Sequence, residues 1–361
     1  MTKKQLYFVI HSLQAGGMER VMSELICYFA AQTNYEVHLV LYGIKRDVFY
    51  QIPSNITIHR PSFAFNNKAR LWSTIKTLFF LRKTLKKSGA HSILSFGERW
   101  NNLVLLSTLG LSLPIYVSDR AQPNKPLGTK DDTLRKWLYP KAKGIIVQTE
   151  KALAIFSKMY GHSNFKIIGN PIRKIADRGL PREKVILMVG RLIQSKNQNR
   201  LIDIFSKLDA PDWKLVLVGY DHLQQENQKN WEQLAKKLGV ADRVIFAGKQ
   251  SDVEQFYLTA SIFAYTSISE GFPNVVGEAM SAGLPIVAYD CIAGPSDLVT
   301  NEQNGYLIPL QDESLFLEKL QLLVNQTELR EQQGIQSKEL IKAFELEMIC
   351  QQYDRFLIDN K

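Results

Sequence analysis

Short apolar runs rich in Val, Ile and Tyr alternate with segments of helical periodicity through most of the chain. The first run, residues 6–10, precedes a segment whose apolar residues recur at helical spacing: Val21, Met22, Leu25, Ile26 and Phe29. A continuous apolar run is typical of a strand that is buried on both faces of a sheet. The alternation therefore predicts βαβ units that build parallel sheets, and the fold class is α/β.

The strand candidates fall into two groups, and a segment of different composition separates them. The groups comprise residues 6–10, 36–43, 56–60, 92–97, 114–119 and 144–149, and then residues 184–192, 213–220, 243–248, 261–267 and 285–290. Residues 169–184 contain two prolines, two glycines and many charges, which is typical of an interdomain linker. Residues 312–359 have helical periodicity throughout. The 361 residues therefore predict two α/β domains, residues 1–172 and 173–345, followed by a helix over 346–361.

The net charge of +10 is unevenly distributed between the two halves. Residues 1–170 carry 24 Lys and Arg against 9 Asp and Glu, whereas the remainder carries 21 against 26. An N-terminal excess of this size favours an anionic partner such as a membrane, a nucleic acid or a phosphorylated substrate. Ordinary surface lysines are the alternative explanation.

Three cysteines far apart in the sequence indicate neither a disulfide framework nor a zinc site, and they suit a reducing cytoplasm. The longest apolar region, residues 101–117, is broken by Gly110 and Pro114, which favours a helix followed by a strand over a membrane span. We therefore expect a soluble protein.

Basic and aromatic side chains gather in the predicted helix over residues 68–87. Its basic residues are Lys68, Arg70, Lys76, Arg82, Lys83, Lys86 and Lys87, and its aromatic residues are Trp72, Phe79 and Phe80. This combination suits the surface of an anionic membrane. A helix that packs on the sheet with a solvated outer face has the same composition, and both interpretations can hold together.

Two loops that follow predicted strands carry features of anion sites. Gly16 and Gly17 precede a helix, so backbone N–H groups there could meet a phosphate, although a tight turn needs the same residues. Arg191 and Lys196 follow the strand at 184–189, where a basic pair would neutralise a diphosphate. His11 lies between the first strand and the glycine pair, and we interpret it as a structural loop residue.

The segment SEGFPNVVGEAM, residues 269–280, places two carboxylates around the start of a helix. Glu270 is predicted to lie on the loop, with Gly271 allowing close approach of a ligand, and a helix is predicted to begin at Pro273 or Asn274. Glu278 then lies a turn inside that helix. Each carboxylate can accept two or more hydrogen bonds from a sugar or ribose diol. A capped surface helix is the alternative for this segment alone.

Several motifs together resemble the retaining GT-B glycosyltransferases of family 4. They are GGMER after the first strand, GNPI at the linker, VGRL with Lys196, EGFPNVVGEAMSAGLPIVA, GPSDLV and NGYLIP. The resemblance covers nearly the whole chain and is more specific in the second half. It implies two Rossmann-like domains that face each other across a cleft, with the final helix crossing back to the first domain. The first domain would bind the acceptor and the second a nucleotide-sugar donor.

The resemblance also implies roles for individual residues. Arg191 and Lys196 would bind the diphosphate, Glu270 would contact the donor sugar, and Glu278 would accept hydrogen bonds from the ribose. The backbone at Gly271, Phe272, Asn274 and Val275 would hold sugar and phosphate, and Gly16 and Gly17 would let the first loop approach the phosphate. Glu270, Arg191, Lys196 and Arg120 are the candidate catalytic residues.

The chain departs from the family at two positions. Arg120 stands in SDRAQP, where many relatives carry a histidine near the donor sugar. It could steady the diphosphate or sugar, or pair with Asp119 to stabilise the loop. In VGYDHLQ, residues Tyr220, Asp221 and His222 replace a common glycine-rich turn, which would alter contacts with the base or sugar of the donor.

The chain contains no DxD pair, so we expect no metal and no cofactor, with the nucleotide-sugar as a substrate. Retention of anomeric configuration is implied by the resemblance alone.

The sequence thus predicts a transferase that moves a hexosyl or N-acetylhexosaminyl group from a UDP-sugar, with GDP-mannose as a second option. The expected acceptor is a glycan linked to undecaprenyl diphosphate, and the expected location is cytoplasmic, peripheral at the inner face of the cell membrane. Two alternatives stay open: a nucleotide-sugar epimerase of the same fold, and a non-enzymatic basic module. We expect no nucleic-acid partner because no such binding motif is present.

Overall fold

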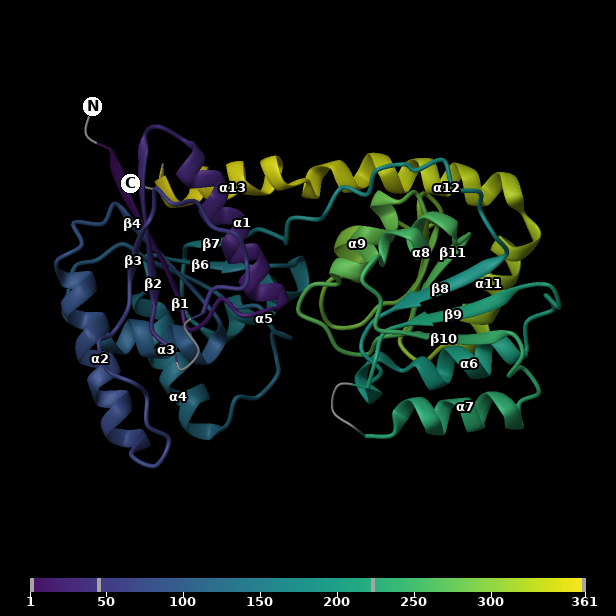
Figure 1. The fold of residues 1–361 in the computed structure, drawn as a ribbon, viewed down its shortest axis with the longest axis horizontal. Coiled ribbons are helices and arrows are strands. Elements are labelled where there is room, and N and C mark those ends of the chain that lie inside the picture. Colours follow the sequence, from purple (N-terminus) through teal and green to yellow (C-terminus); the bar gives the residue numbers. More distant parts are fainter. Residues whose placement is uncertain (1–2, 44–46, 222–224, 359–361) are drawn as a thin grey trace. The chain divides into compact units, whose positions relative to one another are not determined.

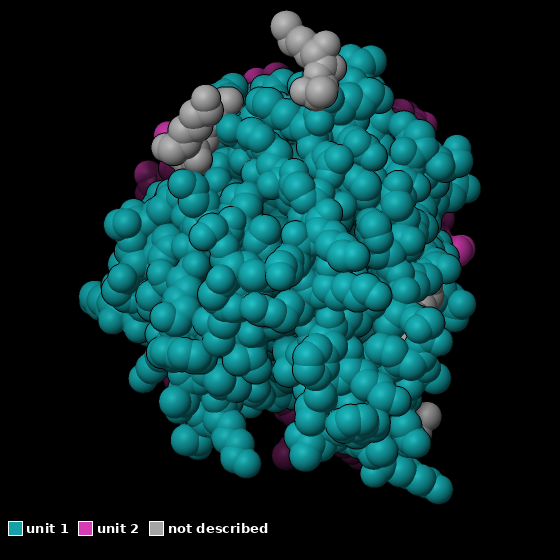
Figure 2. Space-filling view, turned by 90° about the vertical axis from the view of Figure 1, so that its left-hand side faces the viewer, with its two compact units in different colours: residues 1–171, 346–361 teal, residues 172–345 magenta. Residues whose placement is uncertain are grey.

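The computed structural model describes residues 3–43, 47–221 and 225–358, and these form two compact units. Unit 1 comprises residues 1–171 and 346–361, and unit 2 comprises residues 172–345. The surface of unit 1 fills Figure 2 as one continuous body, although its sequence comes from the two ends of the chain.

Unit 1 is built on a parallel sheet whose described strands follow the order β3-β2-β1-β4-β5-β6-β7. The strands are β1 (Lys4–Ile10), β2 (Tyr35–Leu41), β3 (Thr57–His59), β4 (Ser92–Phe96), β5 (Ile115–Ser118), β6 (Gly144–Val147) and β7 (Phe165–Ile167). The helices are α1 (Gly17–Ala31), α2 (Arg70–Lys86), α3 (Glu98–Ser107), α4 (Thr129–Leu138), α5 (Glu150–Met159) and α13 (Leu346–Ile358), with the 3-10 turn η1 (Tyr139–Lys141). Helices α2, α3 and α4 pack in a row, and α1 packs beside α13 (Figure 1).

Unit 2 contains a second parallel sheet, with the described order β10-β9-β8-β11-β12-β13. Its strands are β8 (Val185–Val189), β9 (Lys214–Val218), β10 (Val244–Gly248), β11 (Ile262–Tyr265), β12 (Ile286–Tyr289) and β13 (Gly305–Ile308). Its helices are α6 (Gln198–Ser206), α7 (Asn227–Lys237), α8 (Glu254–Thr259), α9 (Asn274–Ser281), α10 (Pro295–Leu298), α11 (Glu313–Asn325) and α12 (Thr327–Leu340), with the 3-10 turns η2 (Gln194–Lys196) and η3 (Ile341–Phe344).

Strand β8 shows why the strands have continuous apolar sequences. Ile186 and Met188 enter a core covered by α6, α7 and α11, while Leu187 and Val189 enter a second core with α8 and α9. Successive side chains of a strand point to opposite faces, so a sheet covered on both faces needs apolar residues at every position. The parallel order also brings all the strand-to-helix loops of a unit to one edge of its sheet.

The structure confirms the α/β class and the two parallel sheets, and each predicted strand overlaps an observed one. Residues 171–183 contain no helix or strand, and the last segment forms α11, α12 and α13, as predicted. The units divide between residues 171 and 172, one residue from the boundary proposed from sequence, and α13 belongs to unit 1. Strands β7 and β13 were not predicted.

Candidate active site

The loops after β8 and β11 place Lys196 against Glu270 in unit 2. Lys196 ends the 3-10 turn η2 after β8, and its Nζ forms an ion pair with Oε1 of Glu270 in the loop after β11. Both side chains are 13% exposed. These strands are neighbours in the sheet, so their loops meet at its carboxyl edge. The two residues that the sequence assigned to the same site are therefore in direct contact.

Side-chain and backbone hydrogen bonds join the two loops around this ion pair. Ser267 Oγ donates to Glu270 Oε1 at 2.6 Å and lies 3.1 Å from the carbonyl oxygen of Ser195, to which it can donate. Ile268 N–H donates to the same carbonyl at 2.9 Å, and Thr266 Oγ1 donates to the carbonyl of Asn197 at 3.0 Å. These bonds fix the lysine relative to the carboxylate, so the pair is preorganised rather than a chance surface contact.

Tyr265, the last residue of β11, forms the floor beneath the pair. Lys196 Nζ lies 5.5 Å from the centroid of its ring, within the range of a cation–π contact. Burial and the adjacent Glu270 carboxylate raise the pKa of Tyr265 well above its usual value, so its hydroxyl is neutral. The ion pair is thus shielded on the protein side and retains partial access to solvent.

Helix α9 begins at Asn274, one of the two positions predicted from the sequence. A Cβ on Gly294 would lie 2.1 Å from Cδ of Pro273, so the loop before α10 requires glycine to pass this close to the start of α9. Phe272 is buried and packs 5.7 Å from Phe344 between ring centroids, while Gly271, Asn274 and Val275 are partly exposed. These residues follow Glu270 at the start of α9, and the predicted contacts of their backbone with sugar and phosphate stay predictions.

Glu278 and Arg191 lie in the same unit but do not join the ion pair. Oε2 of Glu278 accepts a hydrogen bond from the buried Tyr257 hydroxyl at 2.9 Å, which fixes the carboxylate one turn inside α9. The Arg191 side chain is exposed after β8, and its carbonyl accepts from Gln198 Nε2 at 2.9 Å. Their predicted contacts with ribose and diphosphate stay predictions.

In unit 1, Gly16 caps α1 and Gly17 begins it. The Tyr50 hydroxyl lies 3.0 Å from the N–H of Gly16 and donates to its carbonyl at 2.8 Å. A Cβ on Gly16 would lie 2.2 Å from Oε2 of Glu19, so this carboxylate covers the turn. A phosphate approaching Gly16 would have to displace Glu19.

Arg120 is bound to other parts of unit 1. Its guanidinium donates to Oδ1 of Asn170 at 2.7 Å and to the Tyr353 hydroxyl of α13 at 2.5 Å, and it stacks 3.8 Å from the Phe96 centroid. Asp119 pairs instead with Arg135, at 3.3 Å, so the suggested Asp119–Arg120 pair is not what stabilises this loop. These contacts give Arg120 a role in joining α13 to the sheet, and its predicted donor contact stays untested.

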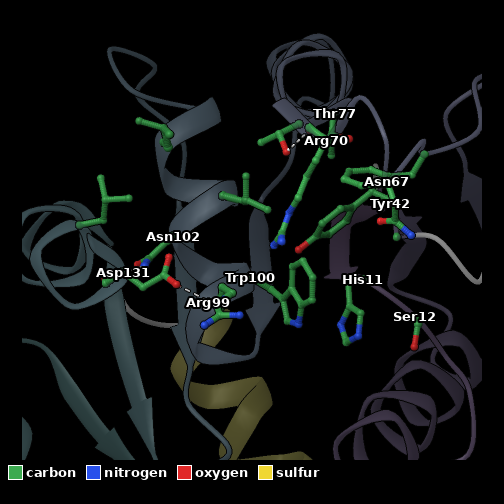
Figure 3. A pocket seen from close by; sticks show the side chains of 16 residues that line it. His11, Ser12, Tyr42, Asn67, Arg70, Thr77, Arg99, Trp100, Asn102 and Asp131 are labelled. Atoms are coloured by element: carbon green, nitrogen blue, oxygen red, sulfur yellow. Dashed lines mark hydrogen bonds and ion pairs between the residues drawn. The ribbon is translucent and has the colours of Figure 1, made fainter. Parts of the chain in front are cut away.

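A cavity of about 850 Å³ in unit 1 escaped the sequence analysis (Figure 3). It lies among the ends of β1 and β2 and helices α2, α3 and α4, and His11, Tyr42 and Trp100 line it. The His11 and Trp100 rings stack with centroids 4.3 Å apart. A single histidine in a loop carries no pairing signal, so the sequence predicts only a structural role for His11. Its position directly after β1, at the carboxyl edge, was the available clue.

The family model described as "Glycosyl transferases group 1" matches residues 173–340. This range falls within unit 2 and contains every residue of the Lys196–Glu270 site. The chain contains a glycosyl transferases group 1 domain. It is a glycosyltransferase, and the resemblance drawn from its motifs is confirmed at that level.

Two relatives that align with nearly the whole chain are named as glycosyltransferases. An uncharacterized glycosyltransferase of Haemophilus influenzae is 28% identical, with 98% of this chain and 100% of the relative covered. A Campylobacter jejuni enzyme is 24% identical, with 99% of each chain covered, and is named GalNAc-alpha-(1->4)-GalNAc-alpha-(1->3)-diNAcBac-PP-undecaprenol alpha-1,4-N-acetyl-D-galactosaminyltransferase. The solved structure of Anabaena HepE in complex with UDP superposes with a TM-score of 0.78 at 18% identity, covering 99% of this chain and 100% of that chain. This last likeness supports the GT-B fold.

None of the helices in the described part of the glycosyltransferase combines the length and apolar composition that a bilayer crossing requires. Within residues 3–43, 47–221 and 225–358, no group of three or more His, Cys, Asp and Glu side chains is placed to hold a metal ion.

Proposed function

We propose that this glycosyltransferase moves a hexosyl or N-acetylhexosaminyl group from a UDP-sugar to a glycan linked to a lipid diphosphate, with retention of anomeric configuration. The Lys196–Glu270 pair at the carboxyl edge of the unit 2 sheet is the observation that carries the proposal. Lys196 meets the charge that develops on the departing diphosphate, and Glu270 accepts hydrogen bonds from the transferred sugar. Arg191 adds a second cation, and Glu278 accepts from the ribose.

The choice of substrates is supported by the relatives rather than by the site alone. UDP is bound by HepE, whose fold this chain shares. An undecaprenol-linked diphosphate glycan is the acceptor in the name of the Campylobacter relative. Retention is supported by the resemblance to family 4. We further propose that the reaction requires no metal, since fixed cations and backbone N–H groups can stabilise the diphosphate.

Helix α2 supports a location at an anionic membrane surface, where a lipid-linked acceptor would lie. Leu71, Trp72 and Phe79 are 77%, 59% and 69% exposed, which is unusual for large apolar side chains. Lys76 lies 5.7 Å from the Trp72 ring centroid, and Lys83 and Lys86 lie in the last turn of the same helix. Aromatic groups enter the interface and lysines meet anionic headgroups. We therefore propose a cytoplasmic protein that is peripheral at the inner face of the membrane.

A thermal-shift panel with UDP, GDP and ADP in EDTA tests the donor side. A nucleotide at a hundred times its dissociation constant stabilises the protein that binds it by about 2.7 kcal/mol, which raises the melting temperature measurably. We expect a shift with UDP that is lost in Lys196→Ala and kept in Lys207→Ala. Lys207 is the matched control because it also forms an ion pair in unit 2, with Asp203, but is 51% exposed at the end of α6. Equal shifts in both variants would contradict the assigned site.

The transfer itself requires product analysis. Proton NMR of the glycosylated product, compared with the donor, reports the anomeric configuration. An inverted product would refute retention and leave the transfer reaction standing. An epimerised nucleotide-sugar formed without acceptor would refute the transferase assignment.

A further inference from the structure

We infer that the cavity of unit 1 binds an N-acylamino sugar at the end of the glycan acceptor, with Tyr42 and Asn102 as specificity-determining residues. The inference rests on the proposed function, and it names the class of sugar that the acceptor presents. The cavity volume of about 850 Å³ lies within the range of roughly 300–1,000 Å³ that small-molecule sites occupy.

Three polar atoms of the lining residues have no hydrogen-bond partner among the described residues: the Tyr42 hydroxyl, Oδ1 of Asn102 and Nδ1 of His11. Tyr42 is 2% exposed and Asn102 is 3% exposed. Buried polar atoms are nearly always paired, so three such atoms around one cavity indicate a polar ligand. Asn102 is also held in place, since its Nδ2 donates to the carbonyl of Asp131 at 3.0 Å.

The same cavity has an apolar wall. Leu103 and Leu106 from α3, Leu134 from α4 and Phe65 before α2 line it, and Trp100 adds an aromatic surface. A sugar with hydroxyls at every position would lose hydration against this wall without recovering hydrogen bonds. A purely hydrocarbon chain would leave the three polar atoms unpaired. The lining therefore selects a ligand that is apolar on one side and polar on the other.

An N-acylamino sugar has this combination. Its acyl methyl can pack on the apolar wall, its amide N–H can donate to Oδ1 of Asn102, and its hydroxyls can pair with Tyr42 and His11. Burial lowers the pKa of His11 to about 4, so the imidazole is neutral and can accept or donate at Nδ1. The C–H face of the ring can pack on Trp100, which is fixed by its stack on His11.

The charges at the cavity do not oppose a neutral sugar. Arg99 is neutralised by Asp131, with Nε and Oδ2 2.8 Å apart, and it also donates to the Leu127 carbonyl at 3.0 Å. The Arg70 side chain extends from α2 into the cavity, toward the Tyr42 hydroxyl and Trp100 (Figure 3). The Arg70 guanidinium can donate a hydrogen bond to the ring oxygen or the acyl oxygen of the sugar. The cavity thus offers donors and acceptors in fixed places, as a specific site requires.

Saturation-transfer NMR on the full chain tests the inference, with methyl N-acetylglucosaminide, methyl N-acetylgalactosaminide, methyl glucoside, methyl galactoside and farnesyl phosphate as probes. We expect transfer to the acetamido methyl of at least one N-acetyl glycoside and much weaker transfer to the plain glycosides. Tyr42→Phe and Asn102→Leu should each weaken binding by roughly three- to tenfold, the value of one neutral hydrogen bond. Transfer to farnesyl phosphate alone, or to all glycosides equally, would overturn the inference.

Tyr160→Phe is the matched control. Its hydroxyl is also buried in unit 1 without a described partner, but Tyr160 does not line the cavity. It should leave glycoside binding unchanged, and a loss equal to that of Tyr42→Phe would refute the site. UDP shifts measured on the same samples separate the two proposals. UDP binding without any glycoside binding refutes the cavity assignment alone. Glycoside binding without a UDP shift refutes the donor site and leaves the cavity assignment standing.

Discussion

The Tyr42 hydroxyl has opposite effects on folding and on binding. It is buried at 2% exposure without a described partner, so it adds a desolvation cost to the folded state that a bound ligand can relieve. We predict that Tyr42→Phe unfolds at an equal or higher urea concentration than wild type, with a gain of up to about 1 kcal/mol. The same variant loses glycoside affinity. Tyr160→Phe should match the stability effect and keep the affinity, so a stability loss specific to Tyr42→Phe would contradict the prediction.

His11 predicts a pH dependence of stability. Burial lowers its pKa from 6.5 to about 4, so between these values the unfolded chain binds more protons than the folded chain. The neutral, buried imidazole therefore makes its full contribution to the free energy of unfolding above pH 6.5. This contribution is lost as the pH falls from 6.5 toward 4. Its size is about 2 kcal/mol after allowance for partial exposure of the ring.

Urea denaturation of wild type and His11→Gln at pH 4.5, 5.5 and 7.5 measures this dependence. The unfolding free energy of wild type should fall relative to that of His11→Gln as the pH is lowered, because only wild type carries the titrating imidazole. Other titrating groups contribute equally to both proteins. A difference that stays constant from pH 4.5 to 7.5 would show that His11 is not shielded from water.

The sequence predicted that Lys196 and Glu270 lie together in unit 2, but it did not predict the unit 1 cavity, and the difference has a physical reason. Lys196 and Glu270 each follow a recognisable buried strand, and adjacent strands of a parallel sheet bring such loops together. The cavity instead joins five short segments, among them His11, Tyr42 and Trp100. The packing of α2, α3 and α4 decides which of their side chains meet, and periodicity does not encode that packing.

At the scale of elements, the first half of α2 exposes large apolar side chains and buries two polar ones, whereas its second half buries Leu81 and Leu85. The buried polar residues are Ser73 and Thr77, and the exposed aromatic residues are Trp72 and Phe79. Helical periodicity predicted the helix, but only the structure shows which face packs on the unit. Exposed aromatic side chains beside lysines are the combination that the proposed contact with an anionic membrane uses.

We predict that Trp72→Glu combined with Phe79→Glu lowers sedimentation with anionic vesicles by roughly tenfold or more, since each change removes an apolar group and adds a repelled charge. Ile335→Glu is the control, because Ile335 is also 62% exposed but lies on α12 of unit 2. Equal sedimentation of wild type with neutral and anionic vesicles would contradict the electrostatic part of the proposal.

The two strands that the sequence analysis missed are short, and both lie at the edge of a sheet. Strand β7 spans Phe165–Ile167 at the edge of its sheet, and β13 spans Gly305–Ile308 at the edge of the other. Three or four residues are too few to establish a period by themselves. Strand β3 (Thr57–His59) is equally short and also lies at an edge, but it was predicted from the β-branched residues Ile56, Thr57 and Ile58. The central strands, which are covered on both faces, were all predicted.

At the scale of the whole molecule, unit 1 is completed by the end of the chain. Helix α13 buries the following side chains in it: Ile349, Cys350, Tyr353, Phe356, Leu357 and Ile358. At roughly 1.5–3 kcal/mol for each large apolar side chain, this burial contributes about 10 kcal/mol. That is comparable to the entire stability of an ordinary domain, about 5–15 kcal/mol. The helix is therefore a structural part of unit 1.

We predict that a chain ending at Glu345 has an unfolded unit 1 and a folded unit 2. Hydrogen exchange should show loss of protection in β1, β2 and β4 but not in β8, β9 and β11, and the UDP-dependent melting shift should persist. Tyr353→Phe is the mild counterpart, because it removes only the hydroxyl that accepts from Arg120 at 2.5 Å. It should cost about 1–3 kcal/mol in unit 1, as expected for a bond to a charged group. Retained protection in β1 after truncation would show that the unit 1 core forms without α13, whereas loss of the UDP shift would show that unit 2 depends on unit 1 for its own stability.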